Sequence, residues 1–224
     1  PTRRSSDLLL GGETAEMAGF YEVGDYDLAG FAVGLVDRSR LITGQEIAEG
    51  DIILGLPSSG LHSNGYSLVR KICFDHQGLT LDQVIPEIGK TLGEELLRPT
   101  RLYPKALMPL IEKGLLKGLV HITGGGFYEN IPRILGDHLA VSINVDAWSR
   151  PAIFTKLQEW GQVAWPEMYR TFNMGIGMVM VVSPQDLEAV KADLNERGEV
   201  YYQIGSVEAR KDQAVILEGE VFHA

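Results

Sequence analysis

The sequence carries four polar, glycine-containing segments whose groups could bind or activate a substrate. In the first, Gly124, Gly125 and Gly126 join an apolar run (119–122) to a run with helical character (127–135). A turn without side chains lets a ligand approach the backbone closely. The N–H groups of a helix's first turn then favour an anion such as phosphate. Because many glycine-rich turns are only tight turns, this turn alone is weak evidence of a phosphate site.

The second segment, residues 58–65, reads Ser-Ser-Gly-Leu-His-Ser-Asn-Gly and lies between an expected strand and an expected helix. Loops held by a rigid sheet often carry catalytic groups. His62 could therefore move a proton near neutral pH. Equally, His62 could be a turn histidine that bonds a carbonyl, and Ser63 or Asn64 could cap the following helix.

The third segment, residues 169–175, places Arg170 and Asn173 just before an apolar strand. An arginine and an asparagine beside a glycine could grip a phosphate or an amide. Arg170 could also pair with Glu167 in a surface turn, and from the sequence this second interpretation is favoured.

The fourth segment holds Glu13 and Glu16 beside a Gly-Gly turn, with Asp25 and Asp27 further along the chain. Carboxylates next to a phosphate site often hold Mg2+, in part through water. A solvated acidic loop is the plainer interpretation, and it is favoured on spacing alone.

Composition and charge narrow the class of protein. The 224 residues are 45% hydrophobic and 22% charged with a net charge of −10, which is typical of a globular protein. No lysine or arginine cluster is present, so nucleic acid is not expected as a partner. Without a run of transmembrane length or a charged leader, we expect no membrane association and a cytoplasmic location. The single cysteine, Cys73, excludes an internal disulfide and is expected to be a small buried hydrophobe.

Apolar runs alternate with helical patterns, which predicts an α/β domain with layered packing. The expected strands are 27–36, 51–56, 119–122, 139–145, 175–182, 202–207 and 214–217. The expected helices are 67–76, 92–97, 104–114, 127–135, 151–160 and 184–197. The charged connector 38–50 marks a domain boundary, which we place after residue 44.

Five strings, in this order and spacing, resemble the phosphoribosylformylglycinamidine cyclo-ligases, also called aminoimidazole ribonucleotide synthetases. They are GGETAEM (11–17), GLPSSGLHSNGYSLVRK (55–71), LLRPTRLYPK (96–105), HITGGGFYENIPRIL (121–135) and MYRTFNMGIGM (168–178). Single strings recur in selenophosphate synthetase, thiamine-monophosphate kinase, formylglycinamidine ribonucleotide synthetase and a hydrogenase maturation factor. The combination indicates the cyclo-ligase family, over the chain from about Leu9 to its end.

This resemblance implies ATP-driven ring closure of formylglycinamidine ribonucleotide to aminoimidazole ribonucleotide, with Mg2+ and in a homodimer. It implies that Glu13 organises the metal–phosphate region. It implies that His62 handles a proton or binds the transferring oxygen. The groups implied to hold the substrate and its 5′-phosphate are Ser59, Asn64, Asn173, Arg170 and the N–H groups of Gly124, Gly125 and Gly126.

The resemblance also implies that the chain is the later part of a longer protein. Residues 1–8 match nothing in the family and are interpreted as an assembly artefact. Residues 9–44 correspond to the last part of an amino-terminal ATP-binding and dimerisation domain, and residues 45–224 to a carboxy-terminal domain with a mixed sheet covered by helices. Ala18 stands where the family usually has proline, which removes a fixed φ. We expect the fragment alone to be inactive and to aggregate through the unpaired edge of strand 27–36.

Two other functions remain open at this point. One is an enzyme of the formylglycinamidine ribonucleotide synthetase type, which shares the glycine loops but normally belongs to a longer chain or has a glutaminase partner. The other is a non-catalytic phosphate-binding fragment. The intact His62 and glycine turn argue against a degenerate gene, whereas the missing front half argues against turnover by this polypeptide.

Overall fold

The computed structural model describes residues 24–222, and its contacts divide the chain into two units at Asp37. Residues 24–37 contain no helix or strand, so the strand predicted over 27–36 is not formed. Its apolar side chains are fully open to solvent, with Phe31 at 101% and Leu35 at 103% exposure. A strand needs a hydrogen-bonded neighbour, and the described part of the chain supplies none here. Aggregation through this segment remains a prediction.

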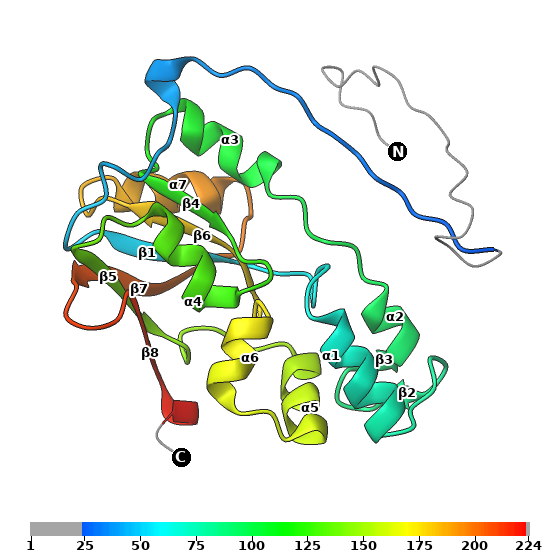
Figure 1. Ribbon diagram of the computed structural model, residues 1–224. Coiled ribbons are helices and arrows are strands. Elements are labelled where there is room, and N and C mark those ends of the chain that lie inside the picture. The colour runs from blue at the N-terminus through cyan, green and yellow to red at the C-terminus, as the bar shows by residue number, and fades with distance from the viewer. Residues whose placement is uncertain (1–23, 223–224) are drawn as a thin grey trace. The chain divides into compact units, whose positions relative to one another are not determined.

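Within residues 38–222, six strands form one mixed sheet in the order β4-β6-β1-β7-β5-β8 (Figure 1). Their bounds are β1 (Ile52–Pro57), β4 (Gly118–His121), β5 (Leu139–Asn144), β6 (Ile176–Val182), β7 (Tyr202–Ala209) and β8 (Val215–Glu218). The β5–β8 pair is parallel and the other four pairs are antiparallel. The mixed α/β class predicted from the sequence is confirmed.

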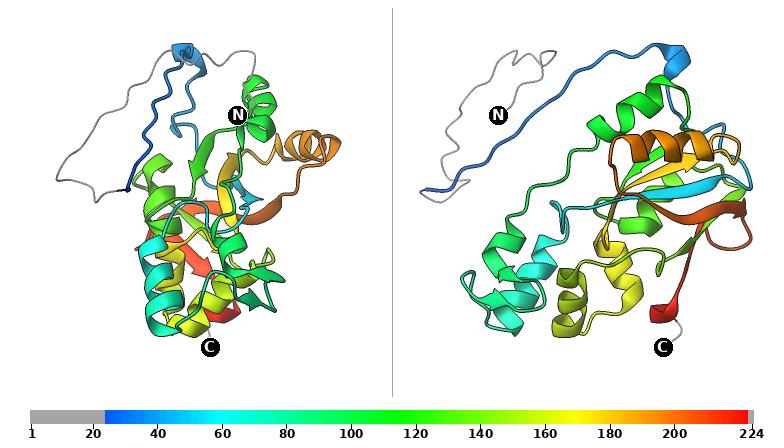
Figure 2. Two further views of the ribbon diagram at one scale, coloured as in Figure 1. Left: turned by 90° about the vertical axis from the view of Figure 1, so that its right-hand side faces the viewer. Right: turned by 180° about the vertical axis from the view of Figure 1, so that it is seen from behind.

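Helices cover both faces of this sheet (Figures 1 and 2). They are α1 (Tyr66–Arg70), α2 (Leu92–Leu96), α3 (Pro104–Glu112), α4 (Gly126–Asn130), α5 (Ala152–Gly161), α6 (Trp165–Thr171) and α7 (Leu187–Glu196). Short helical turns are η1 (Arg38–Arg40), η2 (Lys71–His76, a π-helix), η3 (Ile131–Ile134) and η4 (Glu220–Phe222). A small hairpin, β2 (Val84–Ile85) and β3 (Lys90–Thr91), lies outside the main sheet. None of the helices in the described residues is long and apolar enough to cross a membrane.

Alternate residues of the central strands feed two separate cores, as the period of two in a strand requires. On β1, Ile53 joins the core beneath α4, α5 and α6, whereas Leu54 joins the core beneath α3 and α7. On β6, Val179 and Met180 divide in the same way. Burial on both faces explains why β6 reads as one continuous apolar run.

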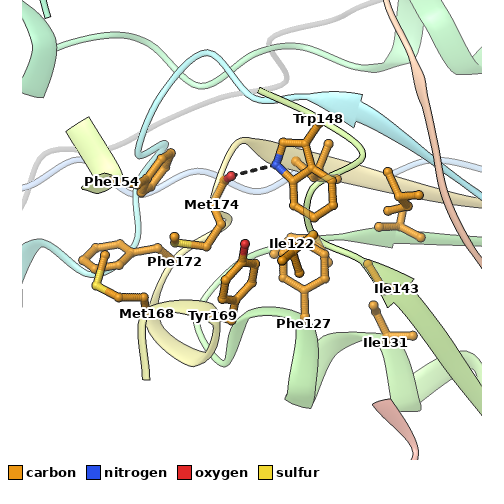
Figure 3. Packing of buried hydrophobic residues seen from close by; sticks show 14 of the residues in the cluster. Ile122, Phe127, Ile131, Ile143, Trp148, Phe154, Met168, Tyr169, Phe172 and Met174 are labelled. Carbon is orange, nitrogen blue, oxygen red and sulfur yellow. Dashed lines mark hydrogen bonds between the residues drawn. The ribbon is translucent and has the colours of Figure 1, made fainter. Parts of the chain in front are cut away.

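The first core holds the segments that carry the candidate site. Phe127 of α4 contacts Tyr169 of α6 edge-to-face, with 5.6 Å between ring centroids, and stacks on Trp148 at 6.0 Å (Figure 3). The indole Nε1–H of Trp148 donates to the Met174 carbonyl at 2.9 Å. These contacts fix α4 and the 172–175 turn against each other. Such edge-to-face and stacked pairs each contribute about 1 kcal/mol beyond area burial.

The structure departs from the predicted elements in three places. The helix predicted over 127–135 is α4 followed by the 3₁₀ turn η3, because Pro132 has no N–H for the next helical bond. Helix α6 and the β2–β3 hairpin were not predicted. Cys73 is fully buried as expected, and burial raises the pKa of its thiol to about 11.

Candidate functional site

His62 lies in the loop between β1 and α1 and is 4% exposed. Its Nε2 accepts a hydrogen bond from the Ser59 N–H at 3.2 Å. Nε2 is therefore unprotonated, and the neutral ring carries its proton on Nδ1. That Nδ1 is buried and has no hydrogen-bond partner among residues 24–222. His62 thus holds an unused N–H donor, the kind of buried orphan that needs a chemical explanation.

The pKa of His62 is lowered to about 4, first by burial and then by the charges of His121 and Arg101. The ring is therefore neutral at pH 7. The proton-shuttling role expected from an ordinary histidine pKa gives way to that of a neutral hydrogen-bond donor. The bland alternatives fail too, because His62 accepts from a backbone N–H and the residue before α1 is Gly65, with no side-chain cap.

Two more aromatic rings surround His62. Tyr103 lies 6.1 Å away and His121 lies 5.9 Å away between ring centroids. Gly177 on β6 forms the floor: a Cβ placed there would lie 2.5 Å from Cε1 of His62. Burial lowers the pKa of His121. The sequence analysis assigned nothing to His121, and its place directly before the glycine-rich turn was the available signal.

Asn173 supports the 58–65 loop from below. Its Nδ2 donates to the carbonyls of Gly60 at 2.9 Å and Leu61 at 3.3 Å, and its Oδ1 accepts from the Gly175 N–H at 2.9 Å. The side chain is 3% exposed. Both ends of the amide are engaged by backbone, so in this structure Asn173 positions the loop and does not face a substrate.

The glycine-rich turn reaches the same loop through Gly124. The nearest atom to a Cβ placed on Gly124 is Oδ1 of Asn64, at 3.6 Å. The structure therefore brings Asn64 and Gly124 together, as the resemblance implied. Gly126 has a packing role, because with φ at +56° its Cβ would lie 1.9 Å from the Tyr169 carbonyl oxygen.

Asn130 fixes this turn from its buried side, and the sequence analysis missed it. Its Nδ2 donates to the carbonyls of Gly124 at 3.0 Å and Gly126 at 2.8 Å, while Thr123 Oγ1 donates to its Oδ1 at 2.9 Å. A polar residue on the apolar face of the 127–135 run was the signal that could have identified it. A turn held this way is preorganised before any ligand arrives.

Arg170 lies at the open side of the turn, half exposed, and is shared by two carboxylates. It lies 3.5 Å from Glu129 and 3.6 Å from Glu167. The Glu167 pair is the surface contact that the sequence favoured. A Cβ on Gly125 would lie 2.7 Å from Glu129 Oε2. A carboxylate therefore covers the turn where an incoming anion would bind, and an anion must displace it.

The Ser59 side chain is also committed to the protein. Its hydroxyl donates to the Pro99 carbonyl at 2.6 Å. Its lone pairs still face outward as acceptors, and its N–H orients His62. Next to it, Ser58 Oγ is buried without a partner in the described residues. The loop thus contains two unsatisfied polar atoms, on Ser58 and His62.

A pocket of about 340 Å³ opens beside His121 and Tyr103. Arg101 and Thr100 form part of its polar side, and α3 and Met178 supply apolar walls. Deeply apolar pockets with a few converging polar groups are the usual form of small-molecule sites. The glycine-rich turn lies outside this lining.

Glu13 and Glu16 lie outside the described residues, so their expected metal role stays a prediction. Within residues 24–222, no cluster of three or more His, Cys, Asp or Glu side chains could hold a metal ion. Any site for Mg2+ therefore needs ligands from elsewhere.

Comparison with known proteins gives one family and several relatives. Residues 48–218 match the family model described as "AIR synthase related protein, C-terminal domain". The chain is 52% identical over 214 residues to a phosphoribosylformylglycinamidine cyclo-ligase of Alkaliphilus oremlandii, covering 96% of this chain and 63% of the relative. It is 51% identical to that of Brevibacillus brevis, covering 92% of this chain and 60% of the relative. The chain thus spans less than two thirds of the length of these relatives.

Solved structures show the same fold at low identity. A thiamine-monophosphate kinase from Stenotrophomonas maltophilia has a TM-score of 0.53 at 15% identity, covering 83% of this chain and 55% of that one. The hydrogenase maturation protein HypE, solved in complex with ATP, has a TM-score of 0.52 at 20% identity, with coverage of 80% and 50%. At these identities the likeness establishes the fold alone.

Proposed function

Because the chain belongs to the family of AIR synthase related proteins, we propose that the complete protein closes the ring of formylglycinamidine ribonucleotide. The product is aminoimidazole ribonucleotide, and ATP is converted to ADP and phosphate. The curated relatives at about half identity carry the cyclo-ligase name. Within the site, the observation that carries the proposal is the unused Nδ1–H of a neutral His62, placed beside the loop that meets the glycine-rich turn.

The proposed reaction explains the need for ATP. The substrate's amide oxygen is a poor leaving group, so the γ-phosphoryl group is first transferred to it and ADP departs. A neighbouring nitrogen then attacks the activated carbon and loses a proton. The C–O bond breaks, phosphate leaves with the oxygen, and the imidazole ring is closed. Such a transfer depends on positioning and on donors that meet the developing charge.

In this proposal His62 supplies one of those donors. A neutral imidazole with its proton on Nδ1 hydrogen-bonds an oxygen of the transferring group, without needing to be protonated first. Since the site is buried, such a bond is stronger than it would be in water. Asn173 holds the loop in place, and Asn64, beside Gly124, contacts the substrate. Ser59 offers its remaining acceptor positions.

The substrate's 5′-phosphate is assigned to Gly124 and Gly125, with Arg170 at the open side. Binding there moves the Glu129 carboxylate off the turn. Arg170 then exchanges a carboxylate partner for a phosphate, with which arginine forms a strong forked pair. This exchange makes the site selective for a dianion, because a weaker anion would not displace Glu129.

We assign ATP and Mg2+ to the region that includes Glu13, together with chain outside the described residues. The absence of a carboxylate cluster within residues 24–222 is consistent with that division. HypE, which shares the fold, was solved with ATP. When bound, Mg2+ would neutralise phosphate charge during transfer. We further propose a homodimer and a cytoplasmic location for the complete protein, and turnover only by the complete protein.

The experiment is a substrate comparison with the full-length protein. Formylglycinamidine ribonucleotide, ATP and Mg2+ should give ADP and aminoimidazole ribonucleotide in equal amounts. Formylglycinamide ribonucleotide with ammonia should give no ADP above background. Turnover of the second substrate alone would establish the synthetase alternative, and turnover of neither would leave a binding module.

A further inference from the structure

The segment 98–103 carries a charged and aromatic motif to which the proposed function gives no role, yet the structure lays it along the His62 loop. Ser59 Oγ donates to the Pro99 carbonyl at 2.6 Å. The hydroxyls of Ser63 and Thr100 lie 3.2 Å apart. The two segments are more than 30 residues apart in sequence, so these contacts connect distant parts of the chain at the site.

Two donors from this segment converge on one acceptor, the carbonyl oxygen of Pro57. Arg101 donates to it through a terminal guanidinium nitrogen at 2.9 Å, and Tyr103 through its hydroxyl at 3.1 Å. Pro57 is the last residue of β1, at a point where the register of the β1–β6 pair shifts. Because proline has no N–H, its carbonyl is the polar backbone group that sets the direction in which the chain leaves the strand.

Arg101 is itself held from the far side. Its second terminal nitrogen donates to a carboxylate oxygen of Glu199, between α7 and β7, at 2.5 Å. Both side chains are mostly covered, with exposures of 23% and 20%. The guanidinium also lies 5.3 Å from the Tyr103 ring centroid. The planar fork of arginine can satisfy Pro57 and Glu199 at once, which a lysine cannot do.

Tyr103 and His62 rest on the same glycine. A Cβ on Gly177 would lie 2.1 Å from the Tyr103 hydroxyl oxygen and 2.5 Å from His62 Cε1. The two rings therefore share one small floor and are 6.1 Å apart at their centroids. A displacement of Tyr103 must change the space that His62 occupies.

We propose that Arg101 and Tyr103, with Glu199 behind Arg101, are positioning residues that hold the His62 ring and its loop in the reactive orientation. They act through the Pro57 carbonyl and the shared Gly177 floor. The kinetic part of this proposal rests on the proposed function, whereas the structural part concerns His62 alone. Its two parts are therefore tested separately.

The structural test uses histidine NMR on the 224-residue chain, with the His62 signal assigned by its loss in His62→Gln. The ionisable groups around His62 are His121, Tyr103 and Arg101. Arg101→Gln removes both the charge and the fork, and should raise the His62 pKa and shift its signals. Arg101→Lys keeps the charge but loses the fork, so it should shift the signals with a smaller change in pKa. Tyr103→Phe should also shift the His62 signals. Lys105→Gln removes an exposed charge from the same stretch and should change neither.

The kinetic test uses the same substitutions in the complete protein. Arg101→Gln and Glu199→Gln should lower kcat by about 10-fold or more while KM changes little, since misplacement of a reacting group acts on the chemical step. Glu199 lies behind Arg101, so a kcat effect from Glu199→Gln requires transmission through Arg101.

The proposal is overturned if the His62 signals and pKa in Arg101→Gln match those in Lys105→Gln. Should Arg101→Gln not fold, Arg101→Lys and Glu199→Gln carry the same comparison, and unchanged His62 signals in both would be decisive against it. Shifted His62 signals with unchanged kcat would instead show that the brace is real and that His62 takes no part in the proposed reaction.

Discussion

The Ser59 N–H donates to Nε2 of His62 at 3.2 Å, and this bond decides which ring nitrogen carries the proton. It leaves Nδ1–H as a buried donor with no partner in residues 24–222. A histidine in this state differs from the neutral-pH proton carrier that its residue type alone suggests. The site offers a fixed hydrogen-bond donor that needs no change of charge before reaction.

The low His62 pKa makes stability depend on pH in a defined window. The ordinary histidine pKa is 6.5 and that of folded His62 is about 4. Between these values the unfolded chain binds a proton that the folded chain does not. The free energy of unfolding therefore falls as pH decreases from 6.5 towards 4, by up to about 3 kcal/mol. Urea unfolding of wild type and His62→Gln at several pH values measures the difference. His76→Gln, at an exposed histidine, should keep the wild-type slope.

Asn173 is expected to matter through the loop it supports. Asn173→Asp replaces two donated bonds with an acceptor facing the Gly60 and Leu61 carbonyls. Leaving buried carbonyls unsatisfied beside a buried charge should lower the free energy of unfolding by about 2–4 kcal/mol. The same substitution at the exposed Asn195 serves as the control. Equal effects at the two positions would contradict the supporting role.

The glycines of the 124–126 turn should separate packing from binding. Gly126→Ala forces a Cβ against the Tyr169 carbonyl at a positive φ, and should cost about 3 kcal/mol or more of stability. Gly124→Ala meets only Asn64 at 3.6 Å and should cost under about 1 kcal/mol. If Gly124 lines a ligand site, however, its alanine variant should lose substrate affinity while folding normally. Thermal unfolding and KM for the nucleotide report the two effects.

Glu129 should compete with anions for the turn. Glu129→Gln removes the carboxylate that covers Gly125, so phosphate should bind more tightly, whereas Arg170→Gln should weaken it. A gain of about 3- to 10-fold in affinity is expected for a half-exposed group. Titration calorimetry with ribose 5-phosphate measures it. Glu167→Gln, which removes the other carboxylate near Arg170, is the comparison. A phosphate affinity that ignores Glu129 would place the anion elsewhere.

Much of the fold could be predicted from the sequence because its central strands are short apolar runs with clear boundaries. The β6 run and the strand before the glycine turn were identified to within one residue at most of their ends. Helix α6 was missed because its start, Trp165-Pro166, follows a short polar link with little periodicity. The strand predicted over 27–36 was wrong for the described chain, since apolar pattern alone cannot supply a neighbouring strand.

For the site, residue types indicated the loops but not how side chains are used. Asn173 and Ser59 were expected to touch substrate, yet their polar groups are largely engaged by backbone. His121 was left without a role because its approach to His62 depends on the pairing of β4 with β6. Contacts between segments about 60 residues apart cannot be derived from local spacing.

The most direct test of the account is turnover by His62→Ala in the complete protein, with ATP, Mg2+ and formylglycinamidine ribonucleotide. Loss of a buried donor to the transferring group should lower kcat by about 100-fold, while His121 and the fold remain intact by circular dichroism. A kcat within a few-fold of wild type, in a protein that still closes the ring, would contradict the role given to His62.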